Sequence, residues 1–194
     1  MAVTYTNRKG STYTLARTET RTGKARYVFT REPHGELVAA LPPATRISES
    51  VNGVVSLVKD TPSAIAATEV AILEQIVRQH PQARHYRVGM HGKHLEVYER
   101  SGPEAEEVAA IFGDIGLRPV RLQQLRDSLD RHARWTAVLR FQLADSEQRT
   151  FWLERRCYLG GMDDWLPMSG SGSLADLAHE VIPLLGTEEL FDRW

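Results

Sequence analysis

Residues 135–158 read W-T-A-V-L-R-F-Q-L-A-D-S-E-Q-R-T-F-W-L-E-R-R-C-Y and carry the clearest strand signal in the chain. From Trp135 to Leu143 apolar and polar side chains alternate, which is the pattern of a strand with one buried face. Asp145–Gln148 is rich in turn-forming residues, and a second apolar stretch, Thr150–Tyr158, follows it. The segment therefore predicts an antiparallel hairpin.

A helix is predicted upstream of this hairpin. Thr61 can cap it, and Pro62 suits the first helical position because proline has no N–H to leave unpaired there. Apolar residues then recur at helical spacing from Ile65 to Val77, and His80-Pro81 ends the pattern.

The rest of this region alternates hairpins and helices in the same way. We expect a hairpin over Tyr86–Glu99 that turns at His91-Gly92, a helix that opens at Ser101–Glu104 and ends near Gly113–Gly116, a helix over Arg118–Arg134, and an amphipathic helix over Leu174–Leu185. A parallel sheet would need single strands between helices. Paired strands instead favour an α+β fold, with an antiparallel sheet and helices on one face.

The first sixty residues are rich in strand signals and poor in helix signals. Two hairpins are predicted: Ser11–Thr20 with Arg26–Arg31, and Thr45–Val51 with Val54–Lys59. The second turns at Asn52-Gly53, for which we expect a type I′ turn with positive φ at both residues. The pattern changes at Asp60-Thr61-Pro62, so we predict a small basic β-rich module over 1–60 and an α+β domain over 61–194.

Several stretches of this module form a recognisable motif. They are Tyr5-Thr6-Asn7-Arg8-Lys9-Gly10, Thr12-Tyr13, Thr22-Gly23-Lys24 and Arg26-Tyr27-Val28-Phe29. Over residues 5–59 the chain resembles a group of uncharacterised bacterial proteins that open with Y-T-N-R-K-G-x-T-Y and continue through T-G-K-x-R-Y-x-F. That group has no established activity, so the resemblance implies no catalytic residue.

Charge is distributed unevenly along the 194 residues. The whole chain has a formal net charge of −1, whereas residues 1–31 hold seven cations and the single acid Glu19, a net charge of +6. Cations interleaved with aromatic rings on a sheet suit phosphate contact and base stacking. The candidate residues for binding nucleic acid or another polyanion are Arg8, Lys9, Arg17, Arg21, Lys24, Arg26, Tyr13 and Tyr27. In the alternative interpretation the aromatic side chains form the core face of a small sheet and the arginines its solvated face.

Other features limit the classes of function. No apolar run has the length of a signal peptide or of a membrane span, so we expect a cytoplasmic protein without a membrane partner. Cys157 is the single cysteine, which excludes an internal disulfide and a cysteine-built zinc site, and its apolar neighbours favour a small buried residue. Phosphate-binding, dinucleotide-binding and nucleophile-elbow motifs are absent, so no cofactor and no catalytic residue are predicted.

Two weaker candidates for metal binding remain. One is the histidine group His80, His85, His91 and His94, which has no firmly spaced third ligand. The other combines Glu154 with Asp163 and Asp164 in a predicted loop over residues 160–165, whose carboxylates could hold Mg²⁺. The alternative to the second candidate is an ordinary Asp-rich turn.

Three functions are therefore compatible with the sequence. The favoured one is a non-enzymatic module that contacts nucleic acid or an acidic protein surface through the basic β-region. The second is a subunit of a protein complex or a homo-oligomer, formed through an exposed apolar helix face or sheet edge. The third is a divalent-metal-dependent enzyme that uses Glu154, Asp163 and Asp164.

Overall fold

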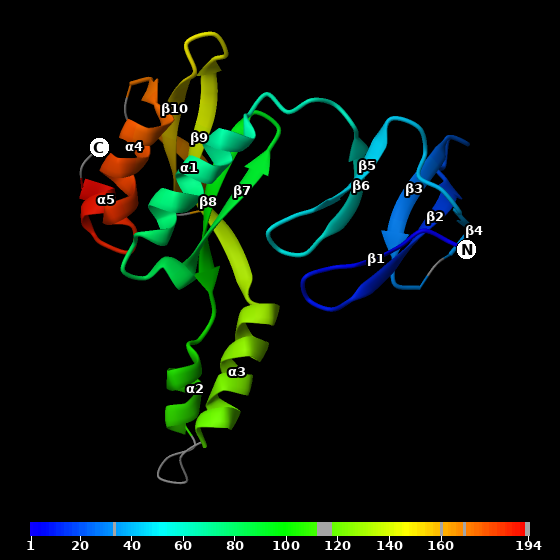
Figure 1. The fold of residues 1–194 in the computed structure, drawn as a ribbon, viewed down its shortest axis with the longest axis horizontal. Helices are drawn as coiled ribbons and strands as arrows, with labels where there is room; N and C mark the ends of the chain where they lie inside the picture. Colours follow the sequence, from blue (N-terminus) through cyan, green and yellow to red (C-terminus); the bar gives the residue numbers. More distant parts are fainter. Residues whose placement is uncertain (33, 112–117, 160, 169, 193–194) are drawn as a thin grey trace. The chain divides into compact units, whose positions relative to one another are not determined.

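The computed structural model confirms the α+β class, with antiparallel strand pairs and helices (Figure 1). It describes the chain apart from residues 33, 112–117, 160, 169 and 193–194. The chain forms two compact units: Met1–Thr61 with Ser101–Arg134, and Pro62–Arg100 with Trp135–Trp194. The helical segment 101–134 thus groups with the N-terminal residues.

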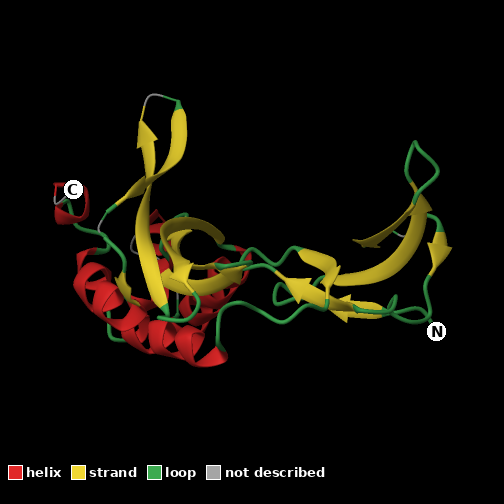
Figure 2. Cartoon of the chain, turned by 90° about the horizontal axis from the view of Figure 1, so that it is seen from above, coloured by secondary structure: helices red, strands yellow, loops and turns green. Residues whose placement is uncertain are grey.

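Strands make up the N-terminal part of the first unit (Figure 2). One sheet contains β1 (Thr4–Thr6), β2 (Thr12–Glu19), β3 (Ala25–Thr30) and β4 (Glu36–Leu37), and a separate hairpin contains β5 (Thr45–Glu49) and β6 (Val55–Lys59). β2 is central in the sheet, because β3 pairs along its length while β1 and β4 pair with successive parts of it. Leu15, near the middle of β2, is completely buried.

Three turns of this part share one construction. In Asn7–Gly10, Thr20–Gly23 and Ser50–Gly53, the glycine N–H donates to the carbonyl of the first residue, at 2.8–2.9 Å. Each glycine has φ between +75° and +78°, a conformation that is costly for residues with a Cβ. The side-chain oxygen of each first residue also accepts from the N–H four residues later. An Asn, Thr or Ser with a glycine three positions on therefore suffices to specify each turn.

The predicted type I′ turn at Asn52-Gly53 is wrong, although the hairpin around it is confirmed. Of the two residues only Gly53 has positive φ. The Ser50 hydroxyl stabilises a longer loop by accepting from the N–H of Val54 at 3.1 Å, which gives the arrangement of a turn followed by a bulge at glycine.

The second unit is built on a sheet in the order β11-β10-β9-β8-β7, with β12 paired to β10. Its elements are α1 (Ala67–Arg78), β7 (Tyr86–His91), β8 (His94–Ser101), β9 (Arg134–Asp145), β10 (Thr150–Leu159), β11 (Met162–Pro167), β12 (Gly172–Ser173), α4 (Leu174–Val181) and α5 (Glu189–Asp192), with short 3-10 turns at Ala83–His85 and Ile182–Leu184. α1 and α4 pack on each other and against the sheet. The core draws on alternate strand residues, among them Leu139, Phe141, Phe151 and Leu153, as the hairpin pattern predicted.

Two local predictions for this unit are wrong. α1 begins at Ala67 rather than at Pro62, because the buried carboxylate of Glu69 accepts from the Ala66 N–H at 2.7 Å and is held by the Arg149 guanidinium. The acidic segment predicted as a loop over 160–165 is largely strand β11, since its backbone pairs with β10; Gly160 lies outside the described residues.

A helical hairpin, α2 (Ala105–Ile111) and α3 (Pro119–His132), occupies the connection between β8 and β9. The predicted end of the first helix near Gly113–Gly116 lies outside the described residues. No helix in the described ranges is both long and apolar enough to cross a membrane.

Candidate nucleic-acid interface

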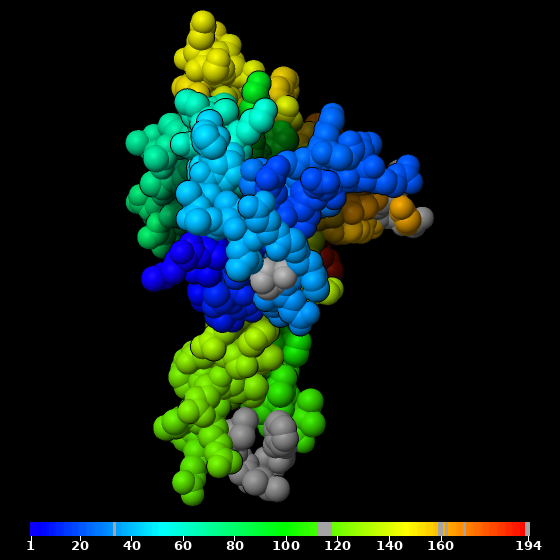
Figure 3. Space-filling model, turned by 90° about the vertical axis from the view of Figure 1, so that its right-hand side faces the viewer, coloured from blue at the N-terminus to red at the C-terminus, as the bar shows by residue number. Residues whose placement is uncertain are grey.

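The hairpin that joins β2 to β3 ends in a basic tip. Beyond Arg17 it is only two strands wide, because β1 and β4 pair with β2 up to that residue. Residues 17–31 hold five cations and one carboxylate, a net charge of +4. In Figure 3 this hairpin, in medium blue, projects from the surface of its module.

Three cations of the tip are accessible. Arg21, Lys24 and Arg26 are exposed, and none of them forms a side-chain ion pair or hydrogen bond within the part of the chain that the structure describes. Arg21 and Lys24 flank the glycine of the turn, and Arg26 lies opposite Thr18 on β2. Close positive charges without a carboxylate partner attract an anion, since no internal pair must be broken first.

Arg8 and Lys9 lie at the other end of β2 and do not join this group. Eight residues of strand separate the two turns, about 26 Å at 3.3 Å per residue. The Arg8 guanidinium binds the Glu49 carboxylate at 2.8 Å and the Val51 carbonyl at 3.2 Å. Lys9 Nζ donates to the Ala133 carbonyl at 3.3 Å.

The remaining candidates are distributed over both faces of the sheet. Arg17 lies opposite Tyr27, and its guanidinium contacts Glu36 at 3.4 Å. Tyr13 is on that same face and lies under the guanidinium of Arg31, which is 5.5 Å from the ring centroid. Arg26 projects from the opposite face, because successive strand residues alternate. The predicted aromatic and cationic residues thus do not form one platform.

The motif that opens the chain builds a junction between two turns. The buried Asn7 amide donates to the Gly53 carbonyl at 2.7 Å, and the Tyr5 hydroxyl donates to Glu49 at 2.9 Å. Burial acts to raise the pKa of Glu49, but the hydrogen bonds from Arg8 and Tyr5 outweigh it and hold that pKa below its ordinary value. The bond to Glu49 in turn raises the pKa of Tyr5. These residues therefore stabilise the module.

The histidines do not gather into one group. His91 and His94 face each other across the β7–β8 turn, whereas His80 packs edge-on against Tyr86 at 4.9 Å. Burial, followed by the nearby Arg140 charge, lowers the pKa of His94. Among the described residues no three His, Cys, Asp or Glu side chains come together as metal ligands would.

The acidic strand separates its two aspartates. Asp163 lies opposite Tyr158 and Asp164 opposite Cys157, so they project from opposite faces of the sheet. Asp163 receives two hydrogen bonds of 2.6 Å from Arg156, which lowers its pKa. Glu154 contacts Arg140 at 3.6 Å. The three carboxylates of the predicted metal site each have a different environment.

A polar cluster that the sequence interpretation missed lies on the sheet face away from α1 and α4. Glu96 is 6% exposed and accepts from Tyr98 at 2.6 Å and from Arg140 at 3.1 Å. Arg140 also stacks on Trp165, 3.9 Å from its ring centroid. Burial and the bond to Glu96 raise the pKa of Tyr98. The polar residues that alternate with the apolar ones on β9 were the available signal, but their partners come from distant strands.

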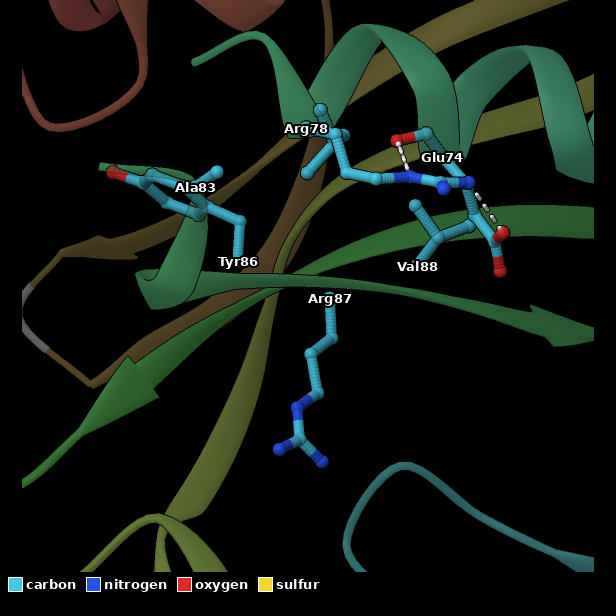
Figure 4. A pocket seen from close by; sticks show the side chains of 7 residues that line it. Glu74, Arg78, Ala83, Tyr86, Arg87 and Val88 are labelled. Atoms are coloured by element: carbon cyan, nitrogen blue, oxygen red, sulfur yellow. Dashed lines mark hydrogen bonds and ion pairs between the residues drawn. The ribbon is translucent and has the colours of Figure 1, made fainter. Parts of the chain in front are cut away.

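A shallow cleft of about 280 Å³ lies between the end of α1 and β7 (Figure 4). Val77, Ala83 and Val88 give it apolar walls, and Arg78 at its edge is paired with Glu74 at 3.2 Å. Arg87 points to the other side of β7, where it stacks on Trp135. No nucleophile or general base with an accessible proton partner lines this cleft in the described part of the chain.

Compared with protein-family models, curated proteins and solved structures, the chain has no match.

Proposed function

We propose that this protein is a binding module that contacts nucleic acid through the tip of the β2–β3 hairpin. The observation that carries the proposal is the set of three exposed cations, Arg21, Lys24 and Arg26, on a two-stranded ribbon with a net charge of +4. A two-stranded ribbon fits the major groove of B-form DNA, which is about 12 Å wide. Side chains at its tip would then reach the phosphates on either side.

Binding of this kind depends mainly on counterion release. Each phosphate neutralised contributes about −0.7 to −0.9 to the slope of log affinity against log salt, so three contacts give a slope of about −2 to −3. Phosphate contacts carry no sequence information, so binding should be largely independent of sequence. The earlier set of eight residues is thereby reduced to the tip, with Arg17 and Tyr27 beside it.

Fluorescence anisotropy with a labelled 20-base-pair duplex, titrated at several salt concentrations, tests the proposal. The double variant Lys24→Glu/Arg26→Glu should lower the affinity and flatten the salt slope by about 1.4 to 1.8, because two contacts are lost. The matched control is Lys59→Glu/Lys93→Glu, which changes the net charge equally at two exposed lysines outside the tip.

The outcomes separate the alternatives. Equal weakening by both double variants would assign the affinity to overall charge rather than to the tip. Absence of binding at about 50 mM salt, where screening is weak, would refute a nucleic-acid partner. If poly-glutamate competes better than unlabelled duplex, the partner is an acidic protein surface.

A further inference from the structure

The α2–α3 hairpin has an apolar stripe that its own residues do not cover. Leu122, Leu125 and Leu129 recur at spacings of three and four on one side of α3, yet no residue of α3 is buried. The spacing is that of a helix that packs its apolar side against neighbours. Here α2 is the one element of the described chain that packs extensively against α3.

The two helices differ too much in length for α2 to cover this stripe. At 1.5 Å per residue, the 14 residues of α3 span about 21 Å and the 7 residues of α2 about 10 Å. α2 presents small side chains, Ala105, Val108 and Ala109, of which only Ala105 is buried. Helices this short are marginally stable alone and depend on tertiary packing.

The charges of the two helices indicate what covers the stripe. Residues 104–111 contain three glutamates and no cation, whereas residues 118–132 contain four arginines and two aspartates. One acidic and one basic helix already pair within the hairpin through Arg126 and Glu106. The same surface is therefore complementary to a copy of itself, as a two-fold symmetric interface requires.

We infer that the α2–α3 hairpin is a homodimerisation element, in which α2 of each copy lies beside α3 of the other. Four antiparallel helices then enclose the leucine stripes in a common core. A face of about 21 by 20 Å per copy buries roughly 1,000 Å² in total, at the low end for specific interfaces, so the dimer should be weak and dissociate at micromolar concentration.

Sedimentation velocity of the full chain over about 5 to 500 µM tests this inference at the affinity expected for a small interface. The average mass should rise from 21.9 kDa toward twice that value. Leu125→Glu should keep the protein monomeric, whereas Gln124→Glu, which adds the same charge at an exposed position of α3, should leave the dimer in place. A monomer throughout the range, or equal effects of both variants, would overturn the inference.

A charge exchange covers the case in which Leu125→Glu disturbs the hairpin itself. Arg121→Glu and Glu107→Arg are both exposed changes, and each should weaken self-association about tenfold or more by placing like charges opposite each other. Mixing the two variants should restore the dimer, because every contact then joins opposite charges again. Failure of the mixture to associate while the wild type does would exclude this arrangement. Neither result affects the test of nucleic-acid binding, which concerns other residues.

Discussion

Replacement of Asn7 by alanine should destabilise the N-terminal strands far more than equivalent changes at the other turns. The Asn7 side chain is 5% exposed and makes three hydrogen bonds: it donates to Gly53 O and accepts from the N–H groups of Lys9 and Ser11. At about 1 kcal/mol for each bond, Asn7→Ala should cost about 3 kcal/mol. Water cannot easily replace these bonds, because the site lies between two turns.

Ser50→Ala is the matched control. Ser50 occupies the same position in its turn and accepts one hydrogen bond, from Val54 N at 3.1 Å, but it is exposed to solvent. Its loss should cost about 0.5 kcal/mol, because water takes over the bond. The two variants therefore separate turn chemistry from the buried junction.

Hydrogen exchange is the suitable measurement, since it reports on β1 and β2 individually. Exchange of these amides should accelerate roughly 100-fold in Asn7→Ala and about twofold in Ser50→Ala, at 1.4 kcal/mol for each factor of ten. Similar acceleration in both variants would refute the assignment of Asn7 as the centre of the junction.

Two further predictions concern the second unit. Arg140→Met should cost about 2–3 kcal/mol, because it removes a partner of a buried carboxylate, while the double variant Glu96→Gln/Arg140→Met should recover at least half of that loss. Urea unfolding followed by tryptophan fluorescence measures both, and an equally unstable double variant would contradict the pairing. Burial and the neighbouring Glu99 raise the pKa of Tyr86 from 10.0 to about 12. The folded state then retains the phenolic proton more strongly than the unfolded state, so this contribution to stability is complete below pH 10 and is lost as the pH rises to 12. Thermal melts should therefore show a smaller loss between these pH values in Tyr86→Phe than in the wild type, and identical losses would count against it.

The basic residues show how far local sequence can lead to a site. Arg8 and Arg21 both occupy the second position of a turn that ends in glycine. Nothing near Arg8 in the sequence distinguishes it from Arg21, yet Glu49, which lies 41 residues away, binds only Arg8. Whether a cation is available to a ligand thus depends on a contact that local sequence does not encode.

The same reason explains which elements were predicted correctly. The sequence by itself determined the hairpin of β9 and β10, the glycine turns and the amphipathic helices, because periodicity, turn chemistry and positive φ are properties of neighbouring residues. Tertiary structure alone decided that residues 162–167 form a strand, since pairing with β10 supplies the partners for their backbone. It also decided where α1 begins, through the contact of Glu69 with Arg149, 80 residues away. Such long-range contacts depend on how the whole chain folds back on itself, and no local pattern specifies them.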